Sequence, residues 1–178
     1  MQRFSPRPPT SSSTSTTVSW RYPTPCTEYD VAALLSHVVG WSLAFAAASV
    51  AEAFDDDPNS YVAGKDAAEV FRAAASDIVT GWRRHGFDRQ VTVRTRSSPG
   101  VMVFNMTLME YFTHGCDPAT ATGQRIPFSE QEATAVLSRA QGTLLDEYRG
   151  AAFGPKVVTG QDAPAVDRML AFMGRTPG

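Results

Sequence analysis

The chain has 178 residues, 43% of them hydrophobic, and is long enough to bury the core of one domain. Its 16 Lys and Arg residues nearly balance its 18 Asp and Glu residues, and no basic run alternates with aromatic residues, which excludes an extended nucleic-acid surface. The two cysteines, Cys26 and Cys116, stand outside any CxxC spacing, which excludes a disulfide framework and a Cys-rich zinc knuckle and favours a reducing cytoplasm.

Residues 1–19 are predicted to form a flexible tail before a single domain at residues 20–178. They are rich in Ser, Thr and Pro and show no apolar period, so they cannot bury enough side-chain area to offset the entropy of ordering. The tail has no apolar core of signal-peptide length, and nowhere does the chain reach about 18 uninterrupted apolar residues. We therefore expect a soluble, cytoplasmic protein with no membrane partner.

The first predicted helix spans about residues 28–54. Thr27 followed by Asp30 is a helix-start signal, and apolar residues then recur with a period of roughly 3.6 residues. An acidic run at residues 55–57 ends the pattern. This run lacks the spacing of a calcium loop, so it predicts a solvated helix end.

A second helix is predicted at Asp66–His85, where apolar residues trace one face before Gly86 ends the pattern. His85 falls at the helix C-terminus, where an imidazole interacts favourably with the helix dipole, so it is not a predicted ligand. The alternating residues of Gln90–Thr95 predict a short strand or an extended loop. A turn is expected at Ser97–Gly100.

The third predicted helix begins near Met102 and contains an apolar stretch. Pro118 is expected to kink or end its regular part, because proline cannot donate a hydrogen bond to the carbonyl of His114. Gly123 closes the segment.

A fourth helix is predicted from the capping box of Ser129 and Glu132 to about Tyr148. The connector Gly150–Pro155 then leads to a last short helix at Ala163–Met173. The chain is thus almost all α with short connections, which predicts a helical bundle.

A candidate metal site comes from the third and first helices. Glu110 and His114 stand four residues apart, so their Cβ atoms lie about 5–6 Å apart on one helix face. His37, in the middle of the first helix, would complete a set of three ligands. Such a set suits zinc or another borderline divalent metal and leaves one coordination position open. Asp117 is predicted to orient His114 by accepting its second ring N–H.

Each of these residues has a structural alternative. The pair formed by Glu110 and His114 also occurs as a simple helix-surface hydrogen bond, and a histidine on an apolar face is more often packed than bound to metal. A purely structural bundle with a protonatable Glu–His pair therefore stays open. Cys116 is either a reactive thiol near the site or a small core residue, and packing is favoured. Trp41, Trp82 and the methionines at 102, 106 and 109 are predicted core residues.

Three blocks of the sequence carry a family resemblance. They are PTPCTEYDV at 23–31 with LSHVVG at 35–40, EYFTHGCD at 110–117 with ATGQ at 121–124, and FGP at 153–155 with a tail at 162–175. In order and spacing these blocks resemble actinobacterial DinB-like proteins of the mycothiol-dependent maleylpyruvate isomerase type. The resemblance extends over about residues 20–178.

This resemblance implies a DinB-like four-helix bundle in which His37, Glu110 and His114 bind a divalent metal. It also implies a thiol cosubstrate, mycothiol, used in transfer or isomerisation of a small electrophilic substrate. A thiol with a pKa near about 8.5 is mostly protonated at neutral pH, and metal coordination deprotonates it. The alternative is a non-catalytic metal-binding or stress-related interaction protein of the same fold.

Three departures from the family pattern bear on these expectations. The family normally begins with a full bundle helix before the Pro-Thr-Pro-Cys segment, and here the tail takes that place, so either a partner in a homodimer supplies a helix or a groove stays open. In the second block Cys116 stands where the family signature has Trp, and this change and the missing helix favour the alternative. The Leu-Ala-Arg that follows in many relatives is replaced by Pro-Ala-Thr at 118–120, which removes a cation near the site.

Overall fold

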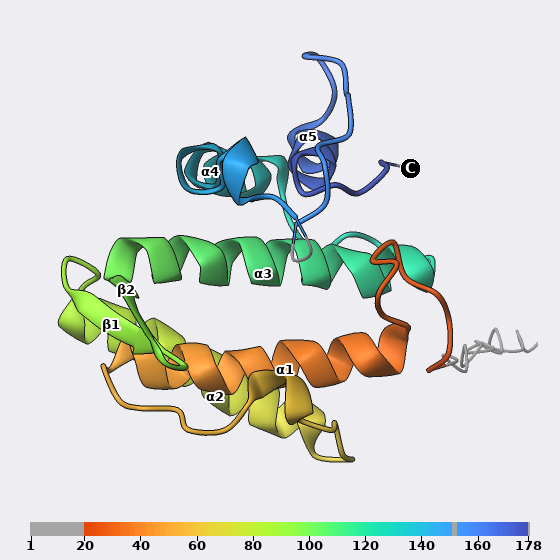
Figure 1. Cartoon of the computed structure of the whole chain (residues 1–178). Coiled ribbons are helices and arrows are strands. Elements are labelled where there is room, and N and C mark those ends of the chain that lie inside the picture. The colour runs from red at the N-terminus through yellow and green to blue at the C-terminus, as the bar shows by residue number, and fades with distance from the viewer. Residues whose placement is uncertain (1–19, 151–152, 178) are drawn as a thin grey trace, which may run out of the picture.

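The computed structural model describes residues 20–150 and 153–177, and the predicted tail at 1–19 lies outside this range. The described part is mostly helical, with one small hairpin (Figure 1). Its elements are α1 (Val31–Ser49), the 3-10 turn η1 (Pro58–Ser60), α2 (Ala67–His85), β1 (Gln90–Val93), β2 (Arg96–Pro99), α3 (Gly100–Ala121), α4 (Glu130–Thr143), the 3-10 turn η2 (Asp146–Tyr148) and α5 (Ala165–Phe172). The predicted helical class is confirmed, with the hairpin as an addition.

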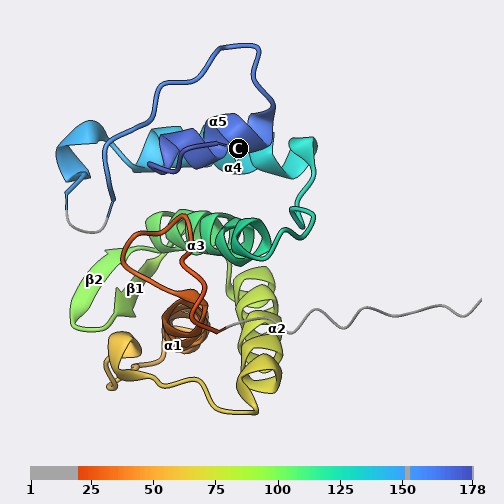
Figure 2. The ribbon, with the colours of Figure 1, turned by 90° about the vertical axis from the view of Figure 1, so that its right-hand side faces the viewer.

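The helices form two layers that share α3. On one side, α1 runs in the opposite direction to α3, and α2 packs against α1 (Figure 1). On the other side, α4 packs against α3 and α5 packs against α4, and Figure 2 shows this pair lying across α3. A single four-helix bundle is not confirmed, because α4 and α5 cross α3 instead of extending the α1–α2–α3 layer.

The core follows the same division. The cluster between α1, α2, β1 and α3 includes Phe45, Ile78, Trp82 and Val103. The cluster between α3, α4 and α5 includes Met109, Phe112, Cys116, Leu137 and Met169. Fully burying one such large apolar side chain contributes about 1.5–3 kcal/mol. Because α3 carries apolar residues on two faces, it joins both clusters.

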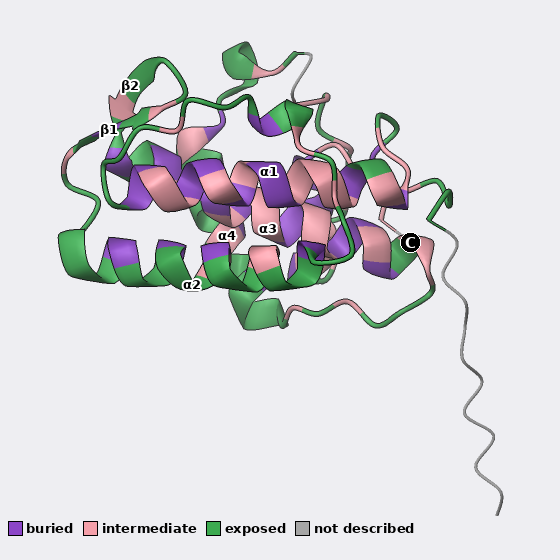
Figure 3. Ribbon diagram, turned by 90° about the horizontal axis from the view of Figure 1, so that it is seen from below, coloured by how far each residue is buried: buried purple, intermediate pink, exposed green. Residues whose placement is uncertain are grey.

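The helix α1 is long and apolar enough to cross a membrane, judged by length and composition alone. In the fold it is a core helix, packed against α2, α3 and η1. Figure 3 shows it almost entirely buried or half-buried, whereas α2 exposes one whole face. Gly40 allows the close approach of η1, since a Cβ there would clash with the carbonyl of Pro58. Its apolar composition is therefore explained by burial within the protein.

The ends of α1 differ from the prediction. The helix is capped by Asp30, whose carboxylate accepts the Ala33 N–H at 2.8 Å, so Thr27 is not the cap. It ends five residues before the predicted Phe54, at Ser49. There Ala51 adopts a left-handed backbone (φ 60°), a conformation that glycine usually supplies, and an alanine at this position does not predict it.

Two further boundaries were predicted wrongly. The segment Ser97–Gly100, expected as a turn, instead contains most of β2, which pairs antiparallel with β1, and the first residue of α3. The tight turn lies earlier and contains Arg94 with φ 55° instead of glycine. The helix α4 ends at Thr143 and not near Tyr148, because Leu144 leaves the helical backbone and buries its side chain in the core beside α5.

The remaining helix predictions agree with the structure. The helix α2 matches the predicted span, α5 lies within its predicted range, and the capping box of Ser129 and Glu132 is present. The helix α3 begins at Gly100, slightly earlier than predicted, and continues through Pro118 to Ala121. Packing on both faces holds α3 helical despite the missing backbone hydrogen bond at the proline.

Candidate metal centre

The three predicted ligands come together between α1 and α3. Because these helices run antiparallel, His37 on α1 faces Glu110 and His114 on α3. One ligand atom from each side chain can be chosen so that all three lie within 4.8 Å of one another. The side chains keep 15%, 18% and 10% of their area exposed, in that order, so the cluster is enclosed but reachable from solvent.

The donor atoms fit a divalent cation. Glu110 Oε1 lies 2.9 Å from His37 Nε2 and 3.7 Å from His114 Nε2. Around a tetrahedral ion with bonds of about 2.0–2.2 Å, neighbouring donors stand about 3.3 Å apart, between these two values. Glu110 Oε1 is buried and, among the described residues, has no hydrogen-bond partner of acceptable geometry. A buried oxygen that lies beside two ring nitrogens without a hydrogen bond is typical of a ligand set arranged around one point.

Asp117 orients the His114 ring through a hydrogen bond with its Nδ1 atom. His114 Nδ1 lies 2.9 Å from Asp117 Oδ2, the hydrogen bond that the sequence predicted. Donation from Nδ1–H leaves the lone pair on Nε2, on the side of Glu110. Burial opposes ionisation of Asp117, but hydrogen bonds from His114 and Arg175 outweigh it and hold the pKa of this carboxyl below its ordinary value.

The His37 ring has a partner of its own. Tyr29 Oη lies 3.1 Å from His37 Nδ1, and the two rings are in contact with centroids 4.7 Å apart and planes tilted by 31°. With the hydroxyl oxygen accepting from Nδ1–H, the lone pair of His37 also sits on Nε2, facing Glu110. Burial raises the pKa of Tyr29, so its hydroxyl stays protonated at neutral pH. Both imidazoles are thereby oriented toward the same carboxylate.

The Pro-Thr-Pro-Cys segment is the loop that brings Tyr29 into place. Thr24 Oγ1 donates to the carbonyl of Tyr29 at 2.7 Å and accepts the N–H of Cys26 at 3.2 Å. A backbone bridge between Pro23 and Asp30 closes the loop. The threonine between two prolines thus cross-links the loop from inside.

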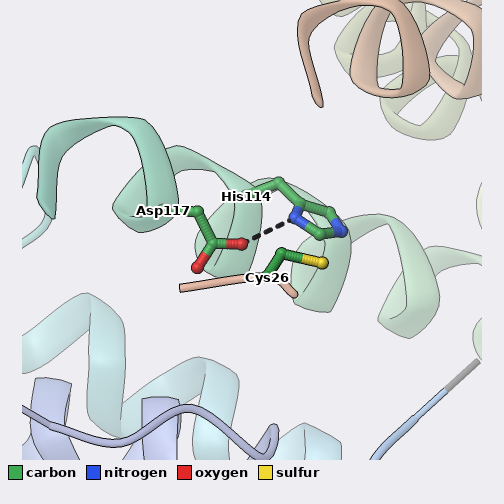
Figure 4. Close-up of side chains that lie close together, drawn as sticks. All are labelled: Cys26, His114 and Asp117. Atoms are coloured by element: carbon green, nitrogen blue, oxygen red, sulfur yellow. Dashed lines mark hydrogen bonds and ion pairs between the residues drawn. The ribbon is translucent and has the colours of Figure 1, made fainter. Parts of the chain in front are cut away.

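Cys26 is a neighbour of the site that the sequence analysis missed. Its thiol lies within 4.8 Å of a ring nitrogen of His114 and a carboxylate oxygen of Asp117, and Figure 4 shows it beside the His114 ring. Burial raises the pKa of this thiol. Cys116, the cysteine weighed from the sequence, packs in the core between α3 and α4 instead, and burial raises its pKa to about 12.

Tyr29 and Arg175 were also missed. Tyr29 and Cys26 fall in the first resembling block and Arg175 in the third, but no periodicity relates either block to the Glu110–His114 pair. Only the folding of the loop and of the segment after α5 onto the site brings these side chains there. The exposed His85 lies at the end of α2, as predicted, away from this group.

Fold and site define a mostly helical protein with a His/Glu/His cluster between two antiparallel core helices. Residues 14–119 match the family described as the mycothiol maleylpyruvate isomerase N-terminal domain, and the chain belongs to this family. The family resemblance stated from the sequence is therefore confirmed.

The chain is also similar to two uncharacterized proteins of Mycobacterium tuberculosis, Rv0738 and MT0763. Each is 29% identical over 158 residues, a stretch that covers 86% of this chain and 84% of the relative. No solved structure is significantly similar to this chain.

Proposed function

We propose that the protein is a divalent-metal-dependent enzyme that acts on a small electrophilic substrate. It uses a low-molecular-weight thiol of the mycothiol type, either as a transferase that attaches the thiol to the substrate or as an isomerase. The observation that carries the proposal is the convergence of His37, Glu110 and His114 with a buried carboxylate oxygen that lacks a hydrogen bond. Family membership supports the thiol. Two nitrogen donors and one oxygen donor suit zinc.

The chemistry follows from the donor set. A bound divalent ion would lower the pKa of a thiol at its open position and hold it as the thiolate. The Asp117 carboxylate, which accepts from Nδ1–H, would keep His114 in the tautomer that binds through Nε2, and Tyr29 would do the same for His37 when its oxygen accepts from Nδ1–H. The ion would thus supply a thiolate nucleophile for an electrophilic carbon of the substrate, which would lose a leaving group in a transferase or the electron pair of its double bond in an isomerase. A transferase would keep the new carbon–sulfur bond, and an isomerase would break it again, restore the double bond and return the thiol.

We also propose that α1, α2 and α3 supply three helices of a DinB-like four-helix bundle. The fourth would come from a second copy in a homodimer. A reducing cytoplasm is the proposed location, in keeping with the two free cysteines and the thiol chemistry.

The test is titration of the cobalt-substituted protein with mycothiol. A thiolate bound to cobalt adds a ligand-to-metal charge-transfer band, and this band should appear with mycothiol and be absent with its S-methylated form. His85→Ala, at the exposed end of α2, is the matched control and should behave as wild type. Cobalt binding without a thiol-dependent band would refute the thiol role and favour the non-catalytic metal-binding alternative. Failure to bind cobalt or zinc would refute the site itself.

A further inference from the structure

Arg175, which follows α5, reaches α3 from the opposite layer of the fold. Its Nε lies 3.2 Å from Asp117 Oδ1, and its Nη2 lies 3.0 Å from Asp117 Oδ2. The guanidinium therefore donates a hydrogen bond to each oxygen of the carboxylate that orients His114. A paired contact of this kind fixes the rotation of the carboxylate as well as its charge.

The local sequence places Arg175 at this point. Gly174 has φ 82°, which ends α5 with a left-handed residue, and the Arg175 N–H returns to the carbonyl of Leu170 at 2.9 Å. The backbone is thus pinned next to the last turn of α5. The α5 helix in turn packs through Met169 into the core shared with α3. The position of the guanidinium depends on the whole α4–α5 layer.

We infer that Arg175 is a positioning residue of the metal centre, which acts through Asp117 on the direction and tautomer of the His114 ring. The inference rests on the proposed role of His37, Glu110 and His114 as metal ligands. It also adds a role for the part of the chain that lies beyond the family match at 14–119, since Arg175 belongs to that part.

The burial of Asp117 is the physical reason. Its side chain is 1% exposed, so water cannot satisfy its oxygens and they depend on donors from the protein. Arg175 donates to both oxygens and fixes the rotation of the carboxylate. Without Arg175 the carboxylate would be free to rotate, and the His114 N–H would lose a fixed acceptor. Partners behind a metal-binding histidine are worth about 10–100-fold in metal affinity.

The experiment is a double-mutant cycle of zinc affinity, measured by competition with a chromophoric chelator. Arg175→Gln should weaken zinc binding by about 10–100-fold and change the cobalt d–d spectrum. In the Asp117→Asn background the same substitution should change the affinity by less than about threefold, because the group through which Arg175 acts is gone. Arg125→Gln, an exposed arginine in the loop after α3, is the control and should bind as wild type.

Arg175→Lys keeps the charge and loses the two-pronged geometry, so it should recover only part of the affinity. This variant also serves if Arg175→Gln fails to fold. Equal zinc affinity in wild type and Arg175→Gln would overturn the inference, as would the same loss in both backgrounds or full recovery by lysine. Absence of zinc binding in the wild type would refute the proposed function, whereas these three outcomes refute the role of Arg175 alone.

Discussion

Replacement of Asp117 by asparagine should destabilise the protein at neutral pH even without metal. The carboxylate is 1% exposed, accepts from His114 and pairs with Arg175, whose side chain is only 15% exposed. Removing one partner of a buried ion pair costs about 3–5 kcal/mol, because the other charge is left uncompensated. The residual exposure of Arg175 favours the lower end, about 3 kcal/mol. At about 2–4 °C per kcal/mol for a chain of this size, the unfolding midpoint should fall by roughly 6–12 °C.

The stability difference between wild type and Asp117→Asn should also depend on pH. Because the pKa of Asp117 is lowered in the folded protein, its contribution is fully present above the ordinary carboxyl value of 3.8 and is lost as the pH falls through the folded pKa. The difference between wild type and Asp117→Asn should therefore stay constant from neutral pH to about pH 5 and narrow only as the pH falls below the ordinary carboxyl value of 3.8.

The assay is thermal unfolding followed by circular dichroism after treatment with a chelator, so that metal binding does not contribute. Asp57→Asn is the control, since the side chains of Asp57 and its ion-pair partner Arg94 are 48% and 46% exposed and such surface pairs contribute about 0–1 kcal/mol. An Asp117→Asn midpoint close to that of wild type at neutral pH would refute the reasoning, as would a difference that does not narrow at acidic pH.

The other predictions concern the site, the layers and the assembly. His114→Ala should abolish stoichiometric metal in elemental analysis of the purified protein. Full metal occupancy with unchanged affinity in this variant would refute the assigned metal site. Phe112→Ala should cost about 3–5 kcal/mol in urea unfolding, because the ring is buried and stacks on Phe128 with centroids 4.6 Å apart; Val62→Ala at an 83% exposed position should change stability by less than about 0.5 kcal/mol. Light scattering should give the mass of a homodimer, and a monomer at all concentrations would contradict the proposed two-fold association.

Much of the helical content was predictable because it depends on local chemistry. The capping box of Ser129 and Glu132 and the apolar face that ends at Gly86 are short-range signals, and both mark real helix ends. The errors fall where a residue adopts a backbone that its type does not announce. Ala51 and Arg94 both have positive φ without being glycine, so the end of α1 and the hairpin turn carried no sequence signal.

The pairing of Glu110 with His114 and the hydrogen bond to Asp117 could be predicted from local spacing alone. The helical repeat places residues three and four apart on one face, whatever the rest of the chain does. The side chains that approach this face from other elements could not be predicted in this way. His37 arrives because α1 runs antiparallel to α3, Tyr29 through a closed loop, and Arg175 through the layer of α4 and α5. These approaches depend on packing between segments far apart in the chain, which no local pattern encodes.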